Sequence, residues 1–243
     1  MLRPKNNKTK PRIKHRPFLK WAGGKFRLTD DLNRVFPKRK QCLIEPFVGA
    51  GAVFLNSHFE RYILADINPD LINLFNIVKE NVDAYIEACK PIFFAENANT
   101  ADYYYVQRDA FNQSSDPFER SVLFLYLNRF GFNGLCRYNS KNEFNVPFGA
   151  YKTHYFPEDE LRYFAHKAQS AVFLCADFQQ TFELADKHSV IYCDPPYAPL
   201  PQDTNFTGYA GNAFGLEHQK NLAECAKKAQ KEKQISVVIS NHD

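Results

Sequence analysis

Short apolar runs, separated by segments with helical spacing, organise this chain. Five of these runs predict buried β-strands: 42–45, 62–65, 171–175, 190–193 and 235–240. Helices are predicted from Phe26 to a stop at Pro37, from Pro69 onwards, and over 217–233. Strands that alternate with helices in this way are typical of a parallel α/β sheet.

The middle of the chain has a different pattern. From about 81 to 128 the apolar positions follow a helical period, and this segment includes the strongly apolar stretch 121–127. Residues 130–151, dense in Gly, Asn and aromatic side chains, predict a loop with a hairpin. The sequence therefore predicts one α/β domain interrupted by a helical insertion that carries a hairpin.

Three of the predicted strands are followed by an acidic residue, namely Asp66, Asp177 and Asp194. The carboxyl ends of parallel strands meet at one edge of a sheet, where ligands bind. We therefore expect the three carboxylates at one site. Each acid taken singly could cap the following helix instead, but capping explains poorly why three strands end alike.

The loop P-F-V-G-A-G follows the first predicted strand. Gly49 and Gly51 allow a tight turn and a close approach of the backbone to a ligand, although an ordinary turn has the same pattern. Together with Asp66, which is placed to bind two ribose hydroxyls, the loop predicts a nucleoside-type cofactor. The third glycine of a dinucleotide loop is absent, since Val53 follows Ala52, and this disfavours a pyrophosphate.

The tetrapeptide D-P-P-Y, Asp194 to Tyr197, ends the fourth predicted strand. The Asp194 carboxylate and the Pro195 carbonyl can both accept hydrogen bonds from one amino group, and Tyr197 can stack on a planar heterocycle. No further metal ligands are adjacent, and Cys193 should point to the opposite face of the strand, so a metal site and a nucleophile triad are both disfavoured. A plain proline turn is the remaining alternative.

Composition limits the kinds of binding partner and of cellular compartment that fit this chain. The net charge of +4 permits a nucleic-acid partner without requiring one. Six scattered cysteines favour neither a zinc site nor a disulfide framework, and are typical of a reducing compartment such as the cytoplasm. No apolar run approaches a membrane span. The basic start, 1–16, lacks a signal-peptide core and predicts a solvated tail or a phosphate-binding arm.

The combined motifs resemble those of amino-group DNA methyltransferases, and in particular the bacterial DNA adenine methylase (Dam) family, which acts on adenine in GATC. The resemblance runs from about Pro17 to the last residue. Besides P-F-V-G-A-G and D-P-P-Y, four motifs carry it: F-L-K-W-A-G-G-K (18–25), A-D-I-N (65–68), L-N-R-F-G-F-N-G-L-C-R-Y-N (127–139) and F-N-V-P-F-G (144–149).

This resemblance implies a Rossmann-like methyltransferase that uses S-adenosylmethionine, releases S-adenosylhomocysteine and needs no metal. The amine of a flipped-out adenine would displace the sulfonium in line. Asp194, Pro195 and Tyr197 would be catalytic. The cofactor-binding residues implied are Trp21, Lys25, Phe47, Gly49, Gly51, Asp66, Asp177, Phe178 and Asp194.

Double-stranded DNA is the partner that the resemblance implies, with no membrane, no obligate protein partner and a monomeric state. Arg137 would recognise a guanine in the major groove. The other DNA-contacting residues implied are Lys20, Arg129, Phe132, Asn133, Leu135, Asn139, Asn145, Pro147 and Tyr151. Turn chemistry at the asparagines and local core packing at Phe132 are the alternatives from the residues alone.

The expected organisation is a basic tail (1–16), a discontinuous catalytic domain (17–69 and 158–243) and a target-recognition domain (70–157). Ala150 replaces an arginine, and Phe132 replaces a tyrosine, that are usual in the family. Further C-terminal strands are expected beyond Asp243, so the chain looks truncated. A non-catalytic DNA-binding relative and a methyltransferase for another base amine are the alternatives. Roles in mismatch repair, DNA replication timing or phage defence are not distinguished.

Overall fold

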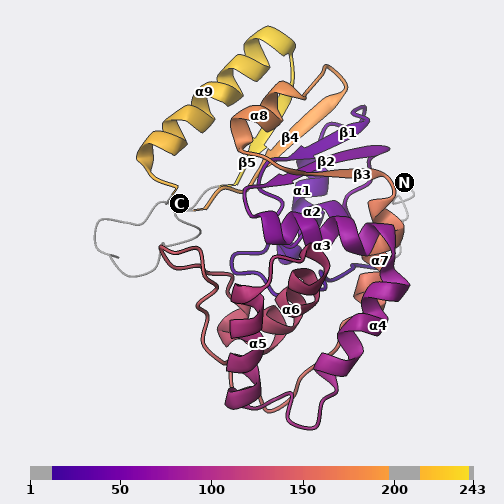
Figure 1. Ribbon diagram of the computed structural model, residues 1–243. Helices are drawn as coiled ribbons and strands as arrows, with labels where there is room; N and C mark the ends of the chain where they lie inside the picture. Colours follow the sequence, from indigo (N-terminus) through magenta and orange to yellow (C-terminus); the bar gives the residue numbers. More distant parts are fainter. Residues whose placement is uncertain (1–12, 197–213, 241–243) are drawn as a thin grey trace, which may run out of the picture.

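The computed structural model describes residues 13–196 and 214–240 (Figure 1). Tyr197, most of the basic tail and the terminal Asp243 lie outside the described residues.

A five-stranded sheet confirms the predicted α/β class. Its strands are β1 (Cys42–Glu45), β2 (Arg61–Asp66), β3 (Ala171–Cys175), β4 (Ser189–Cys193) and β5 (Ser236–Ile239). Every pairing is parallel, in the order β3-β2-β1-β4-β5. All five predicted strands are present, because each apolar run is short enough to cross the core once.

Helices cover both faces of the sheet (Figure 1). Side chains alternate along a strand, so Leu43 of β1 packs toward the cluster that includes α2 (Ala52–Asn56) and α3 (Pro69–Glu80), whereas Ile44 packs toward α8 (Phe178–Glu183) and α9 (Leu216–Lys233). The remaining helices around the sheet are η1 (Phe26–Leu28), α1 (Thr29–Val35) and α7 (Glu158–Ala168).

The insertion consists of α4 (Val82–Phe93), α5 (Ala101–Gln113) and α6 (Pro117–Phe130), which lie together beyond α3 (Figure 1). Asn81, Thr100 and Asp116 begin these helices by accepting backbone hydrogen bonds with their side chains. The continuous helical period predicted from 81 to 128 is therefore confirmed as three helices with capped starts. α6 is buried on every side from Ser121 to Asn128.

The predicted hairpin, 130–151, is present in an irregular form. It contains the short 3₁₀ turn η2 (Phe132–Gly134) and two isolated antiparallel bridges, Gly131 with Phe148 and Tyr138 with Phe144. The segment thus returns on itself without a regular ladder in its described residues. Its shape depends on contacts with the helices beneath it, such as the hydrogen bonds between Asn112 and the backbone of Phe144.

Within residues 13–196 and 214–240, no helix is both long and apolar enough to cross a membrane.

Candidate active site

A cavity of about 890 Å³ opens at the carboxyl ends of the central strands. β1 and β4 are neighbours, and the chain leads from β1 to β2 on one side of the pair and from β4 to β5 on the other side. Such a topological switch point is where ligands bind in open parallel sheets. The volume of the cavity is large enough for a cofactor together with part of a second substrate.

Most of the predicted cofactor residues line this cavity. The structure brings together side chains that lie far apart in the sequence: Trp21, Lys25, Phe47, Gly49, Asp66, Asp177, Phe178, Asp194 and Pro195. Gly51 is not among the lining residues; it begins α2 with a left-handed backbone (φ 75°), which is the role of a turn glycine. Tyr197 lies outside the described residues.

Asp66, at the end of β2, is held as an acceptor. Its carboxylate accepts hydrogen bonds from the backbone N–H of Gly49 (3.2 Å) and of Asn68 (3.0 Å). Burial raises the pKa of Asp66 to about 6, and the backbone hydrogen bonds limit the rise. The acid therefore sits beside the glycine loop, oriented and largely ionised at neutral pH.

Gly49 is required by the close approach of Trp21. Its backbone is left-handed (φ 48°), and a Cβ there would meet the indole Nε1 of Trp21 at 2.8 Å. The tryptophan ring thus lies directly on the loop, which forms one wall of the cavity with it. No side chain larger than hydrogen leaves both groups in place.

Asp194, at the end of β4, forms an ion pair with Lys25 (Nζ to Oδ1, 2.7 Å). Both side chains are mostly buried, with 12% and 20% of their surface exposed for Lys25 and Asp194 respectively. Burial raises the pKa of Asp194, and Lys25 opposes that rise. The lysine comes from the loop before η1, so the first motif of the chain completes the site formed by its fourth strand.

Glu45 is a cavity residue that the sequence analysis missed. It ends β1, only 2% of its surface is exposed, and its Oε1 has no hydrogen-bond partner among the described residues. Burial and the nearby charge of Asp194 raise the pKa of Glu45 well above the usual range of a glutamate. The sequence did offer a signal for Glu45, since this acid ends a predicted strand and directly precedes the P-F-V-G-A-G loop.

An aromatic cluster lies where the cavity meets α8 and α9, and the sequence predicted only some of its members. Phe47 stacks on Phe178 at 5.7 Å, and Phe214 meets the edge of Phe47 at 5.6 Å. His218, on the first turn of α9, lies against Phe214 and also lines the cavity. Phe214 and His218 were not predicted, because no local pattern shows that the start of α9 returns to this edge.

Asp177 has the capping role that was the alternative for each strand-end acid. Its side chain accepts a hydrogen bond from Gln180 N–H in a capping box that begins α8. It nevertheless lines the cavity beside Phe178. Capping fixes the carboxylate at the strand edge, so the two roles are compatible.

Three predicted DNA contacts gather at the mouth of the cavity. Lys20 donates from Nζ to the carbonyl of Arg129 (2.8 Å) and lies 3.8 Å above the ring of Tyr151. Burial and the charge of Arg129 lower the pKa of Lys20 to about 8. Arg129 lies over the ring of Tyr155 and is half-buried, with an Nε that has no partner within the described part of the chain. The cluster is cationic where cavity and hairpin meet.

Arg137 is exposed on the hairpin, and Asn145 holds its guanidinium. The Arg137 Nε donates to Oδ1 of Asn145 (2.7 Å), and a second nitrogen donates to the Asn145 carbonyl (3.1 Å). Asn139 instead accepts from the backbone of Lys141 and Glu143, as its turn alternative requires. Arg137 is thus pre-oriented on the protein surface.

The start of the hairpin presents Phe132 to solvent, with 46% of its surface exposed, and Asn133 has a left-handed backbone (φ 52°). Gly134 packs so closely on the Cβ of Lys20 that any side chain there would clash. The turn therefore presents the exposed ring of Phe132 and the amide of Asn133 next to the cationic Lys20–Arg129 cluster. The other predicted contacts in the hairpin are Leu135 and Pro147, of which Leu135 is half-buried.

Among the residues that the structure describes, no group of three or more His, Cys, Asp or Glu side chains is placed to hold a metal ion.

The doubly covered parallel sheet, the glycine loop after β1 and the acids at the strand ends define a Rossmann-like methyltransferase. A family model described as D12 class N6 adenine-specific DNA methyltransferase matches residues 21–243. The chain belongs to this family.

Its relatives support the same assignment. The chain is 81% identical over 243 residues to the DNA adenine methylase of Haemophilus influenzae, which covers 100% of this chain and 85% of that protein. It is 60% identical over 230 residues to the DNA adenine methylase of Vibrio cholerae and 59% identical to that of Escherichia coli, covering 95% of this chain and 82% of each relative. The predicted resemblance to DNA adenine methylases is thus confirmed.

Proposed function

We propose that this chain transfers a methyl group from S-adenosylmethionine to the exocyclic N6 amine of a flipped-out adenine in double-stranded GATC. The observation that carries the proposal is the half-buried Asp194 at the end of β4. It shares one cavity with the half-buried acid Asp66 and the glycine loop against which Trp21 packs.

The order of groups along the strand ends fits an elongated nucleoside. The Asp177–Phe178 end of β3, Asp66 of β2, the Gly49 loop of β1 and Asp194 of β4 follow one another at neighbouring strands, spaced by about 5 Å each. The aromatic cluster would border the adenine ring, Asp66 would accept from the ribose hydroxyls, and Lys25 would lie near the amino-acid end. When bound, the cofactor supplies an electrophilic methyl group on a sulfonium.

The Asp194 corner would prepare the adenine amine. An exocyclic amine on a base is a poor nucleophile because its lone pair is conjugated with the ring. The Asp194 carboxylate and the Pro195 carbonyl would accept hydrogen bonds from its two N–H groups and hold the nitrogen in place. The raised pKa of Asp194 also makes its carboxylate a better acceptor for the proton that the methylated nitrogen releases.

We further propose that 70–157 forms the target-recognition region and that 17–69 with 158–243 forms the catalytic region. Arg137 would contact a guanine, and Phe132 with Asn133 would enter the duplex as the adenine leaves it. The DNA would contact the cluster at the cavity mouth, where Lys20 would bind a base and Arg129 and Tyr151 would bind backbone phosphates. The partner in this proposal is duplex DNA in the cytoplasm.

Transfer of labelled methyl groups tests the proposal directly. We expect labelling of a duplex containing GATC and about a thousandfold less labelling of a scrambled duplex, with the label recovered as N6-methyladenine. Equal labelling of both duplexes would contradict the specificity. Cofactor binding without any transfer would identify a non-catalytic DNA-binding relative, and label on cytosine would identify another amine as the target.

Affinity for S-adenosylhomocysteine is expected to fall as the pH drops through about 6. Only ionised Asp66 offers acceptors to both ribose hydroxyls, and burial raises its pKa to about 6. Binding is therefore at full strength above this pH, and weakens up to about tenfold per unit below it. Calorimetric titrations from about pH 5 to about pH 8 measure this profile.

Asp66→Asn is the matched variant for this profile. It keeps the size of the side chain, removes the titrating group, and is expected to bind weakly with a flatter pH profile. A slope that remains comes from other titratable groups of the cavity, among them Asp194 and Glu45, whose pKa values are also raised. A parent profile with no change across the range rules out this role for Asp66.

A further inference from the structure

Arg137 is flanked by two buried residues that face the opposite way. Cys136 and Tyr138 are 6% and 8% exposed, whereas Arg137 between them is exposed. This alternation is that of an extended segment, whose neighbouring side chains point to opposite faces. Whatever holds Cys136 and Tyr138 therefore fixes the position from which Arg137 faces outward.

Both anchors are at the start of α3. The Tyr138 hydroxyl donates to the carboxylate of Asp70 at 2.6 Å, and the side-chain amide of Asn68 donates to the sulfur of Cys136 at 3.3 Å. The backbone N–H of Asn68 also donates to Asp66. One short stretch of chain thus contacts both the proposed ribose acid and the recognition segment.

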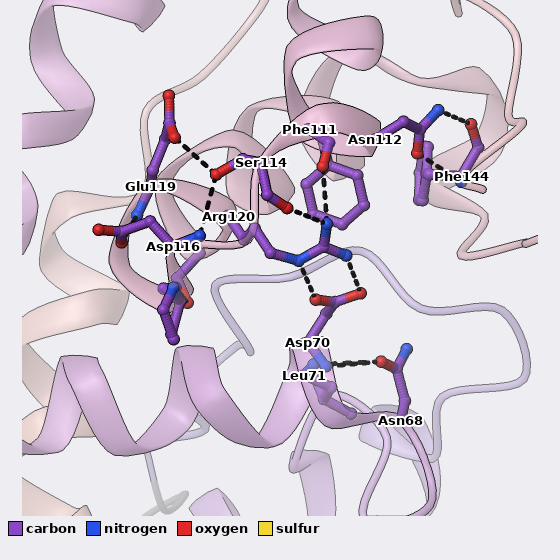
Figure 2. Close-up of polar contacts among 12 residues, drawn as sticks. Asn68, Asp70, Leu71, Phe111, Asn112, Ser114, Asp116, Glu119, Arg120 and Phe144 are labelled. Carbon is purple, nitrogen blue, oxygen red and sulfur yellow. Dashed lines mark hydrogen bonds and ion pairs between the residues drawn. The ribbon is translucent and has the colours of Figure 1, made fainter. Parts of the chain in front are cut away.

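Asp70 is itself held by Arg120 (Figure 2). It is 7% exposed, and its two oxygens accept from Nε and a second nitrogen of Arg120 at 2.8 and 2.9 Å. The third guanidinium nitrogen of Arg120, Nη1, donates to the carbonyls of Phe111 and Ser114 at the end of α5. A planar guanidinium with bidentate contacts is a rigid support, so Asp70 cannot shift without disturbing α5 and α6.

We infer that Asp70, held by Arg120, is a positioning residue for target recognition, and that the Tyr138 hydroxyl is the link through which it sets the place of Arg137. The inference rests on the proposed GATC methyltransferase function. Neither Asp70 nor Tyr138 needs to touch a base. Their effect on specificity passes entirely through the arginine between the two anchored side chains.

The variant Tyr138→Phe removes one oxygen atom and leaves the ring in its place. With the hydroxyl gone, Arg137 has more freedom, so its contact becomes less selective. The ratio of kcat/KM between a GATC duplex and a duplex with one G·C pair replaced is expected to fall roughly tenfold. Because the ratio compares two substrates of one preparation, it does not depend on the folded fraction.

Tyr85→Phe is the matched control. It removes another buried tyrosine hydroxyl, which donates to the carbonyl of Ser121 at 2.8 Å and joins α4 to α6. This variant is expected to keep the parent ratio. If both variants lower the ratio equally, or if neither does, the inference is wrong, while discrimination by the parent protein leaves the proposed function standing.

A double variant tests whether Tyr138 acts through Arg137. Tyr138→Phe combined with Arg137→Ala is expected to discriminate no worse than Arg137→Ala alone. Additive losses would show that Tyr138 acts independently and would overturn the inference. A parent protein that does not discriminate between the two duplexes fails the proposed function itself, which separates that failure from failure of the variants.

Discussion

Replacing Asp194 by asparagine is expected to slow methyl transfer roughly 100- to 1000-fold, the loss typical when one preorganised polar group at a reacting centre is removed. The asparagine keeps the shape of the side chain, but it places an NH₂ donor where the adenine amine needs an acceptor. It also removes the ion pair with Lys25, whose Nζ lies 2.7 Å from the carboxylate. Asp194→Ala is expected to lose at least as much.

Binding should be far less sensitive than the rate of transfer. The DNA-contacting residues that we propose lie in the hairpin and at Lys20 and Arg129, so a fluorescence titration with a GATC duplex is expected to change by no more than a few-fold. Single-turnover transfer, measured at saturating cofactor and DNA, isolates the chemical step. A variant that methylates at the parent rate would rule out the proposed role of Asp194.

Asp186→Asn provides the control for this experiment. Asp186 lies just before β4, at the opposite end of the strand from the cavity, where its carboxylate accepts from Ser189 and the His188 backbone. The substitution removes the same charge from the same strand. It is expected to leave the transfer rate within about twofold, since exposed positions far from a site seldom have larger effects.

The sequence predicts the sheet and the two principal acids for the same reason. Each strand is a short apolar run, and the first polar residue after it must leave the core at the carboxyl edge. Asp66 and Asp194 are therefore placed by a purely local pattern. Parallel pairing then collects them at one edge, because every strand runs in the same direction.

The contacts that hold the hairpin in place could not be predicted in this way. Tyr138 and Asp70 are separated by 68 residues, and the side chain of Asn128 binds the backbone of Lys20 across 108 residues. Periodicity shows which face of an element is buried, but it does not identify the residue that lies against that face. Glu45 was missed for a related reason, since a strand-end glutamate is ordinarily solvated.

Replacing Arg137 by alanine is expected to lower discrimination at one G·C pair of GATC by roughly tenfold to a hundredfold, which corresponds to the loss of one bidentate contact with guanine. Asn145 already holds the guanidinium through two hydrogen bonds, so little side-chain entropy is lost when DNA binds. Affinity for duplexes without the site should change much less, because it depends on phosphate contacts elsewhere.

The comparison of kcat/KM across duplexes with single replaced pairs locates the contact. A loss confined to one pair identifies a base contact, whereas equal weakening for specific and non-specific duplexes would make Arg137 a phosphate contact. Arg162→Ala removes the same charge from α7, where Arg162 pairs with Asp83 and Glu158, and is expected to leave discrimination unchanged. Asn145→Ala should give an intermediate loss, because it removes the Oδ1 acceptor and leaves the guanidinium with the contact to the backbone carbonyl alone.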